Sequence, residues 1–216
     1  MMKFIIAYIT LIVSVGTGIF FYKKLQPKWL RLVTWFLLFT LLTELTGIAF
    51  IFYTKKSNHF IFNFYILIQF LFYFYFFYKT FEQRNLKSLT QLMAVIFVIY
   101  YLYNIFWGTG FFIFSAASNS IGSIFIIICC LLYFVSLFQS ELNLNYFRIP
   151  MFWMATGLLF YFTGNFIYLS LMGYIEKHNL DTSGNFYMYI MVTLNFLLYG
   201  LFTSGLLSNQ LWKNGT

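Results

Sequence analysis

The stretch that decides the fold is Trp29–Tyr53, WLRLVTWFLLFTLLTELTGIAFIFY. It is long enough to cross the hydrocarbon core of a bilayer as a helix, which takes about 20 apolar residues. Glu44 lies inside it, and no other apolar segment of the chain contains an acidic side chain. A carboxylate at the centre of a membrane helix costs about 2.5–3.5 kcal/mol on insertion scales, so we expect Glu44 to face protein or water and to be protonated or paired. Glu44 is therefore the first candidate for a functional residue.

The composition of the whole chain also points to a membrane. Of 216 residues, 62% are hydrophobic and 25% are aromatic, while only 8% are charged; soluble domains have about 25% charged residues. A soluble domain of this size has too little interior to bury so many apolar side chains, which argues against a soluble enzyme. The excess of Phe, Ile, Tyr, Asn and Lys over Ala, Gly and Arg suits an AT-rich genome, so we expect a bacterial protein of the plasma membrane.

Apolar runs of spanning length recur along the rest of the chain. They predict an all-α, polytopic membrane protein: a single domain over residues 1–216, with a seven-transmembrane-helix bundle and no soluble domain. The first run resembles a signal peptide, but no small-residue cleavage pattern follows it, so we expect it to remain as a helix. The predicted spans are 4–22, 30–54, 59–78, 89–107, 120–139, 150–173 and 185–208.

The distribution of Lys and Arg between the predicted loops indicates the orientation. Nine lie on one side of the membrane: Lys23, Lys24, Lys28, Arg31, Lys79, Arg84, Lys87, Arg148 and Lys213. Four lie on the other: Lys3, Lys55, Lys56 and Lys177. Basic residues concentrate on the cytoplasmic side, so we expect the N-terminus outside and the C-terminus in the cytoplasm. The net charge of +8 then reports orientation, and we expect no nucleic-acid partner.

Polar side chains on four predicted spans lie at one depth. Counted at about 1.5 Å per residue from the nearest boundary, each lies about 15–18 Å inside the membrane. Tyr or Thr residues stand one turn away on the same faces, since residues three or four apart are neighbours on a helix. The candidate ligand-binding residues are Glu44, Gln69, Asn165, Asn195, Tyr65, Tyr161, Tyr199 and Thr40.

Two interpretations of this polar layer remain open. In the structural one, the amides join helices by hydrogen bonds worth about 0.6 kcal/mol each, and Glu44 is a neutral acid that donates to an amide or a carbonyl. In the functional one, the residues line a site or path for a small polar ligand or an ion, with Glu44 as the titrating or cation-pairing group.

Two short echoes suggest an internal repeat. Asn63-Phe64-Tyr65 recurs as Asn185-Phe186-Tyr187, and Thr46-Gly47 recurs as Thr163-Gly164. Both echoes are separated by four spans, which fits two parallel three-helix halves joined by a linking helix, a 3+1+3 arrangement. The connection from Gly108 to Asn119 predicts either an external vestibule or an ordinary link followed by a small-residue helix contact at Ser118 and Gly122.

Sequence patterns for catalysis are missing. The chain contains no G-x-S-x-G, H-E-x-x-H, P-loop or paired-carboxylate pattern. Cys129 and Cys130 are adjacent within an apolar run and suggest neither a disulfide framework nor a zinc site. We therefore predict no catalytic residue, no metal site and no cofactor.

These observations favour an integral membrane receptor-like or accessory subunit. Through its polar layer it would bind a small or lipophilic ligand, or a partner membrane protein. Its cytoplasmic parts are too short to form an output domain, so signalling would require another subunit. The alternative is a small solute or ion-coupled transporter that uses Glu44, and a lipid-modifying enzyme is the third class.

Overall fold

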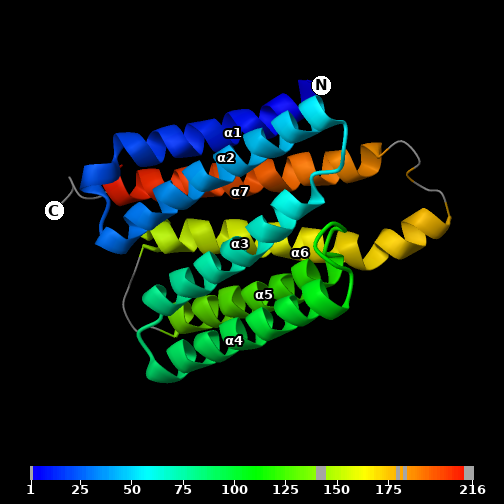
Figure 1. The fold of residues 1–216 in the computed structure, drawn as a ribbon. Helices are drawn as coiled ribbons and strands as arrows, with labels where there is room; N and C mark the ends of the chain where they lie inside the picture. Colours follow the sequence, from blue (N-terminus) through cyan, green and yellow to red (C-terminus); the bar gives the residue numbers. More distant parts are fainter. Residues whose placement is uncertain (1, 140–144, 179–180, 182–183, 212–216) are drawn as a thin grey trace.

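The computed structural model describes residues 2–139, 145–178, 181 and 184–211. Within these residues the chain forms seven α-helices and no β-strand (Figure 1). Short 3-10 turns, η1 (Tyr22–Lys24), η2 (Lys28–Leu30) and η3 (Tyr146–Arg148), precede two of the helices. The helices are α1 (Met2–Phe20), α2 (Arg31–Thr54), α3 (His59–Thr80), α4 (Arg84–Trp107), α5 (Ala116–Phe138), α6 (Pro150–Lys177) and α7 (Asn185–Leu211).

Each helix coincides with one predicted span. Six of them, α2 to α7, are long and apolar enough to cross a membrane, and α1 contributes a shorter described apolar stretch, Tyr8–Phe20. The main differences are at the helix ends: α4 begins at Arg84 and α6 continues to Lys177, beyond the apolar runs. Backbone at such ends can be helical in the polar interface, where apolar length no longer marks the boundary. The helices are those of a multi-pass membrane bundle.

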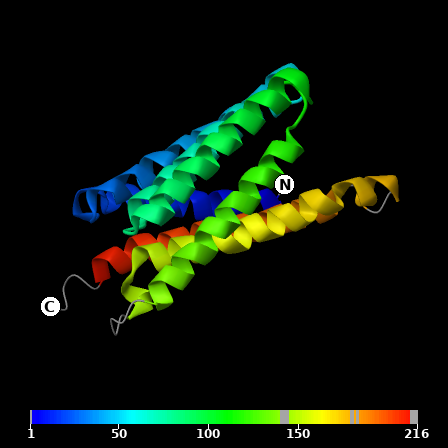
Figure 2. The same cartoon turned by 90° about the horizontal axis from the view of Figure 1, so that it is seen from below.

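The helices follow one another around the bundle. Each packs against its neighbour in the sequence, α7 closes the ring by packing against α1, and α3 also contacts α5. α7, far from α1 in the sequence, lies beside it, and α6 packs against α7 (Figures 1 and 2). Ring order alone would arise in any sequential bundle, so the 3+1+3 repeat stays a prediction.

The core is centred on the fully buried ring of Phe70 in α3. Its centroid lies 4.9 Å from that of Phe97 in α4 and 5.3 Å from that of Phe162 in α6. Gly122 in α5 lies against the same ring, because a Cβ atom there would come within 2.5 Å of Phe70. The small-residue contact expected at Gly122 is therefore present, and it brings four helices together at one side chain.

Large apolar side chains also cover much of the outer surface. Ile99 is 64% exposed, and Trp107 is 76% exposed. In water, so much exposed apolar surface would promote association. Hydrocarbon is the environment in which it is stable, since all the backbone groups of a helix interior are already paired.

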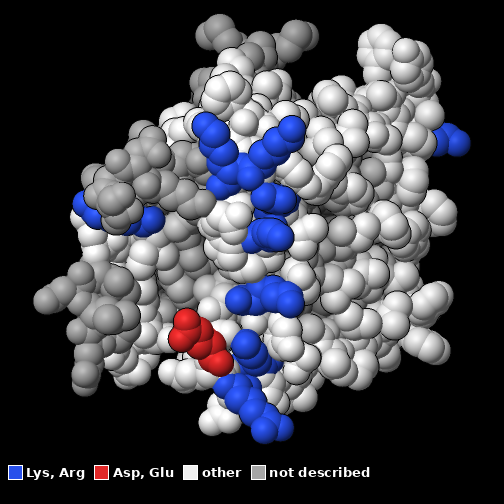
Figure 3. All heavy atoms as spheres, turned by 90° about the vertical axis from the view of Figure 1, so that its left-hand side faces the viewer, with Lys and Arg blue, Asp and Glu red and all other residues white. Residues whose placement is uncertain are grey.

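Lys and Arg side chains form a band across the end of the bundle where α1 and α7 finish (Figure 3). We call this the basic end. Among the described residues in the connections at the basic end, Glu82 is the one acidic residue. Of the four bases expected on the opposite side, Lys55, Lys56 and Lys177 lie in described segments, and the side chain of Lys3 lies outside the described residues. Lys213, expected on the side of the basic end, also lies outside them. The basic end carries Lys23, Lys24, Lys28, Arg31, Lys79, Arg84, Lys87 and Arg148.

Candidate functional site

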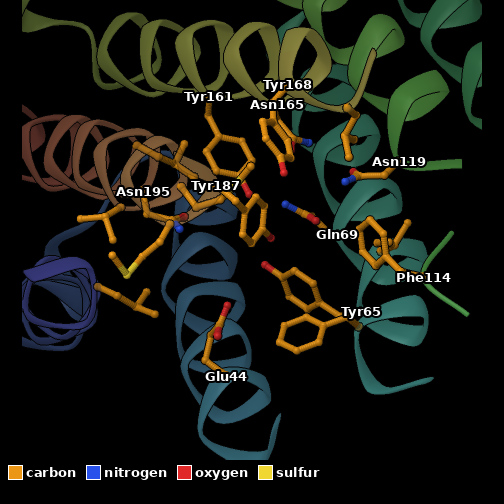
Figure 4. Close-up of a pocket in the computed structure, with 18 of the residues that line it drawn as sticks. Glu44, Tyr65, Gln69, Phe114, Asn119, Tyr161, Asn165, Tyr168, Tyr187 and Asn195 are labelled. Atoms are coloured by element: carbon orange, nitrogen blue, oxygen red, sulfur yellow. The ribbon is translucent and has the colours of Figure 1, made fainter. Parts of the chain in front are cut away.

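A cavity of about 460 Å³ lies between the helices, toward the end opposite the basic one (Figure 4). Residues of α1, α2, α3, α6 and α7 line it, together with the start of α5 and the connection before it. The cavity is therefore formed by the packing of several helices against one another. Its size is within the range of about 300–1,000 Å³ typical of small-molecule sites.

Most of the predicted site residues meet in this cavity. The residues that line it include Glu44, Gln69, Asn165, Asn195, Tyr65, Tyr161 and Tyr199. Thr40 does not line it: its hydroxyl lies 2.9 Å from the hydroxyl of Tyr65 and donates to the carbonyl of Phe36. Thr40 thus holds a lining side chain in place. Whether these residues bind a ligand stays a prediction.

Glu44 extends from α2 toward the cavity (Figure 4). It is partly exposed, and the hydroxyl of Tyr8 in α1 donates to its Oε2 over 3.3 Å. In the described part of the chain, its other oxygen has no hydrogen-bond partner. Neither Lys nor Arg occurs among the described lining residues. The carboxyl group is thus open to a partner from the cavity.

Two amide side chains of the lining, Asn165 and Gln69, are buried and have no hydrogen-bond partner on a neighbouring helix among the described residues. Asn165 is 4% exposed and Gln69 is 7% exposed, and the amide of Gln69 lies beside the hydroxyl of Tyr73 on its own helix. No hydrogen bond among the described residues joins Glu44, Gln69, Asn165 and Asn195 to one another. Unpaired amides in an apolar interior are costly, so water or a ligand in the cavity would stabilise them.

The hydrogen bonds that join α1 and α7 come from other residues. Ser14 in α1 donates to the carbonyl of Tyr199 over 2.6 Å, and its Oγ lies 2.6 Å from the hydroxyl oxygen of Thr203. Together with the Thr40 to Tyr65 contact between α2 and α3, these bonds provide cross-helix pairing at the edge of the cavity. The midplane amides are left available on the cavity surface.

The connection before α5 closes one side of the cavity. The amide of Asn63 in α3 donates to the carbonyls of Phe111 and Ile113, each over 2.8 Å, and its oxygen accepts from the backbone of Ser115 over 3.0 Å. Phe114, between these anchor points, lines the cavity. This connection was expected to form either a vestibule or a simple link, and it forms a fixed wall of the cavity.

Several lining residues were missing from the predicted set. Tyr8, Asn119, Tyr187 and Tyr168 all line the cavity, as do three methionines of α6 and α7. Tyr168 lies on the predicted stripe of Asn165, so helical spacing could have included it. The facing of Tyr8 and Asn119 depends on the rotation of α1 and α5, which sequence spacing does not determine. The methionines are Met172, Met188 and Met191.

The chemistry that the cavity offers is hydrogen bonding and pairing with a cation. Carbonyl, amide and phenol groups surround one carboxyl group, and aromatic and Met side chains supply apolar contact. Among the described residues no group of three or more His, Cys, Asp or Glu is arranged to hold a metal ion. Cys129 lies in the core instead, with its Sγ 4.0 Å from the sulfur of Met93.

Comparison with known proteins gives no family for this chain. No family model matches it, and no similar curated protein or solved structure was found.

Proposed function

We propose that the protein binds a small ligand in this cavity and works as a receptor-like or accessory subunit of a bacterial plasma membrane. In this proposal the chain crosses the membrane seven times, with the N-terminus outside and the basic end in the cytoplasm. The connections at the basic end are short, so a response to the ligand would pass to a partner membrane protein.

One observation carries the proposal: polar side chains from four helices line the cavity and, among the described residues, are not hydrogen-bonded to one another. Asn165 is the clearest case, since it is 4% exposed and has no side-chain partner among the described residues. Folding buries such a group at a cost unless something else satisfies it. A ligand that binds there would recover that cost, which favours binding over a purely structural role.

The proposal is tested by filling the cavity. Val192 in α7 lines it, whereas Val95 in α4 is 55% exposed on the outer surface. We expect a small molecule to be released on denaturation of purified wild-type protein in lipid nanodiscs, and of Val95→Phe, as detected by mass spectrometry. Val192→Phe should retain less than about one-tenth as much, because the added ring occupies the ligand volume.

A second experiment, with the same variants, tests whether the protein has a partner. Cross-linking in cells should capture a membrane protein with the wild type and with Val95→Phe. The proposal is wrong if wild-type protein carries no small molecule beyond the lipids of empty discs and captures no partner.

A transporter is the second candidate, and the position of Glu44 favours it. The cavity extends from Asn58, in the connection between α2 and α3, and His59, the first residue of α3, to Glu44 near the middle of α2. An ion-coupled carrier needs a titrating group that is reached from one side in this way. In the proposed orientation the cavity lies toward the outer side of the membrane and its carboxyl group lies near the middle of α2, as alternating access requires.

Flux measurements separate the two functions. For a carrier, Glu44→Gln should reduce proton movement into dye-loaded proteoliposomes under an imposed pH gradient to the level of empty liposomes. The matched control is Glu82→Gln, which changes an acid at the basic end and should leave flux unchanged. Equal proton flux with and without the wild-type protein would rule out the transporter function.

A further inference from the structure

The geometry of the cavity points to a ligand class: a small organic cation, held by Glu44 and enclosed by tyrosine rings, with a neutral polar or aromatic part toward the amides. This inference rests on the proposed function and names the chemistry that the same site would select. Three features of the lining support it.

The first feature is the charge of the lining. Among the described lining residues Glu44 is the one acid, and none is a Lys or Arg that could pair with it. Tyr8 donates to one carboxyl oxygen over 3.3 Å, which leaves the other oxygen open to a donor from a ligand. A protonated amine would supply that donor together with the opposite charge. Charge-assisted hydrogen bonds of this kind are roughly twice as strong as neutral ones.

The second feature is the aromatic enclosure. The rings of Tyr168 and Tyr187 lie 5.1 Å apart between centroids, and Tyr65, Tyr161 and Tyr199 also line the cavity. In Figure 4 the labelled tyrosines surround the same space as Glu44. A ring face attracts a desolvated cation by about 2 kcal/mol or more, so a cavity lined by several tyrosine rings and one carboxyl group favours a cation over a neutral ligand of equal size.

The third feature is the distribution of neutral polar groups. Gln69, Asn119 and Asn165 come from α3, α5 and α6, across the cavity from Glu44 in α2 (Figure 4). Amides can donate to and accept from a neutral polar group, but they do not neutralise a second charge. For the carboxylate of an anionic or zwitterionic ligand, His59 is the one described lining residue that could become a cationic partner, and a carboxylate without such a partner is strongly disfavoured in such a site.

The test uses three probes of similar size that differ in charge: phenethylammonium, 2-phenylethanol and phenylacetate. Binding to the full-length protein in nanodiscs is measured by titration calorimetry, with empty discs subtracted. We expect phenethylammonium to bind about tenfold or more tightly than 2-phenylethanol, a difference of about 1.4 kcal/mol, and phenylacetate to bind more weakly than either. Glu44→Gln should reduce the preference for the cation to less than about threefold, while Glu82→Gln keeps it.

The outcomes distinguish this inference from the proposed function. If 2-phenylethanol binds as tightly as the amine and Val192→Phe abolishes both, the cavity is a ligand site but the cation class is wrong. A preference that persists in Glu44→Gln also overturns the inference. Failure of all three probes on the wild type overturns the cation class, and the mass-spectrometric comparison of Val192→Phe with Val95→Phe then decides the proposed function separately. The three-probe comparison on the unmodified protein does not depend on the folding of any variant.

Discussion

Asn63 is the side chain that holds the connection before α5 in place. It is fully buried, and three hydrogen bonds join its side chain to the backbone of that connection. The backbone carbonyl of Asn63 also accepts a hydrogen bond from the hydroxyl of Tyr101 over 2.9 Å. The amide of Asn104 strengthens the same region by donating to Ser115 over 2.6 Å. Asn104 thus helps to anchor this wall of the cavity.

Replacing Asn63 with Ala should lower the free energy of unfolding, because carbonyl and amide groups of the connection lose their partners. Each unsatisfied buried group costs about 1–3 kcal/mol, so we expect a clear fall in the melting temperature of the protein in detergent. The matched control is Asn119→Ala, since the Asn119 side chain lines the cavity without a hydrogen bond among the described residues. A control that melts as early as Asn63→Ala would contradict the assigned role.

Helix contacts depend on glycine where two elements approach closely. A Cβ atom on Gly122 would come within 2.5 Å of the Phe70 ring, which is packed between α4 and α6 and has little room to move. At Gly200 in α7 an added Cβ would meet nothing within 4 Å. The two positions thus separate the effect of lost space from the general effect of alanine in a helix.

We expect Gly122→Ala to destabilise the bundle by about 1–3 kcal/mol, as overpacking of a core does. Gly200→Ala should be neutral or slightly stabilising, because alanine favours a helix over glycine by about 1 kcal/mol. Thermal unfolding followed by tryptophan fluorescence measures both. An equal loss in the two variants would mean that α5 does not pack on Phe70.

For the whole molecule, the charge distribution makes a topological prediction. Lys28 lies at the basic end, and Lys56 lies in the connection between α2 and α3 at the other end. Both side chains are exposed, whereas Cys129 and Cys130 are 0% exposed and should not react with a thiol reagent. Introduced cysteines therefore report on the two sides without removal of the native ones.

In intact cells, a membrane-impermeant maleimide should label Lys56→Cys and not Lys28→Cys. Lys28→Cys should become labelled after the membrane is permeabilised, because the basic end is expected in the cytoplasm. The wild-type protein is the control for background labelling. Labelling of Lys28→Cys alone in intact cells would reverse the proposed orientation, and labelling of both in intact cells would place both ends outside.

Helix number and helix positions followed from the sequence alone, while the common depth of the polar residues stays a prediction. Hydrocarbon sets the length of a spanning helix, so apolar runs such as Trp29–Tyr53 mark helices within a few residues of their ends. The same length rule placed Glu44, Gln69 and Asn165 at one depth. Only the tertiary structure decided which of these groups meet in a cavity, that Thr40 supports it from behind, and that Tyr8 and Asn119 belong to its lining. Depth depends on the position along one helix, whereas facing depends on how each helix is rotated against its neighbours, and that rotation is set by packing around side chains such as Phe70.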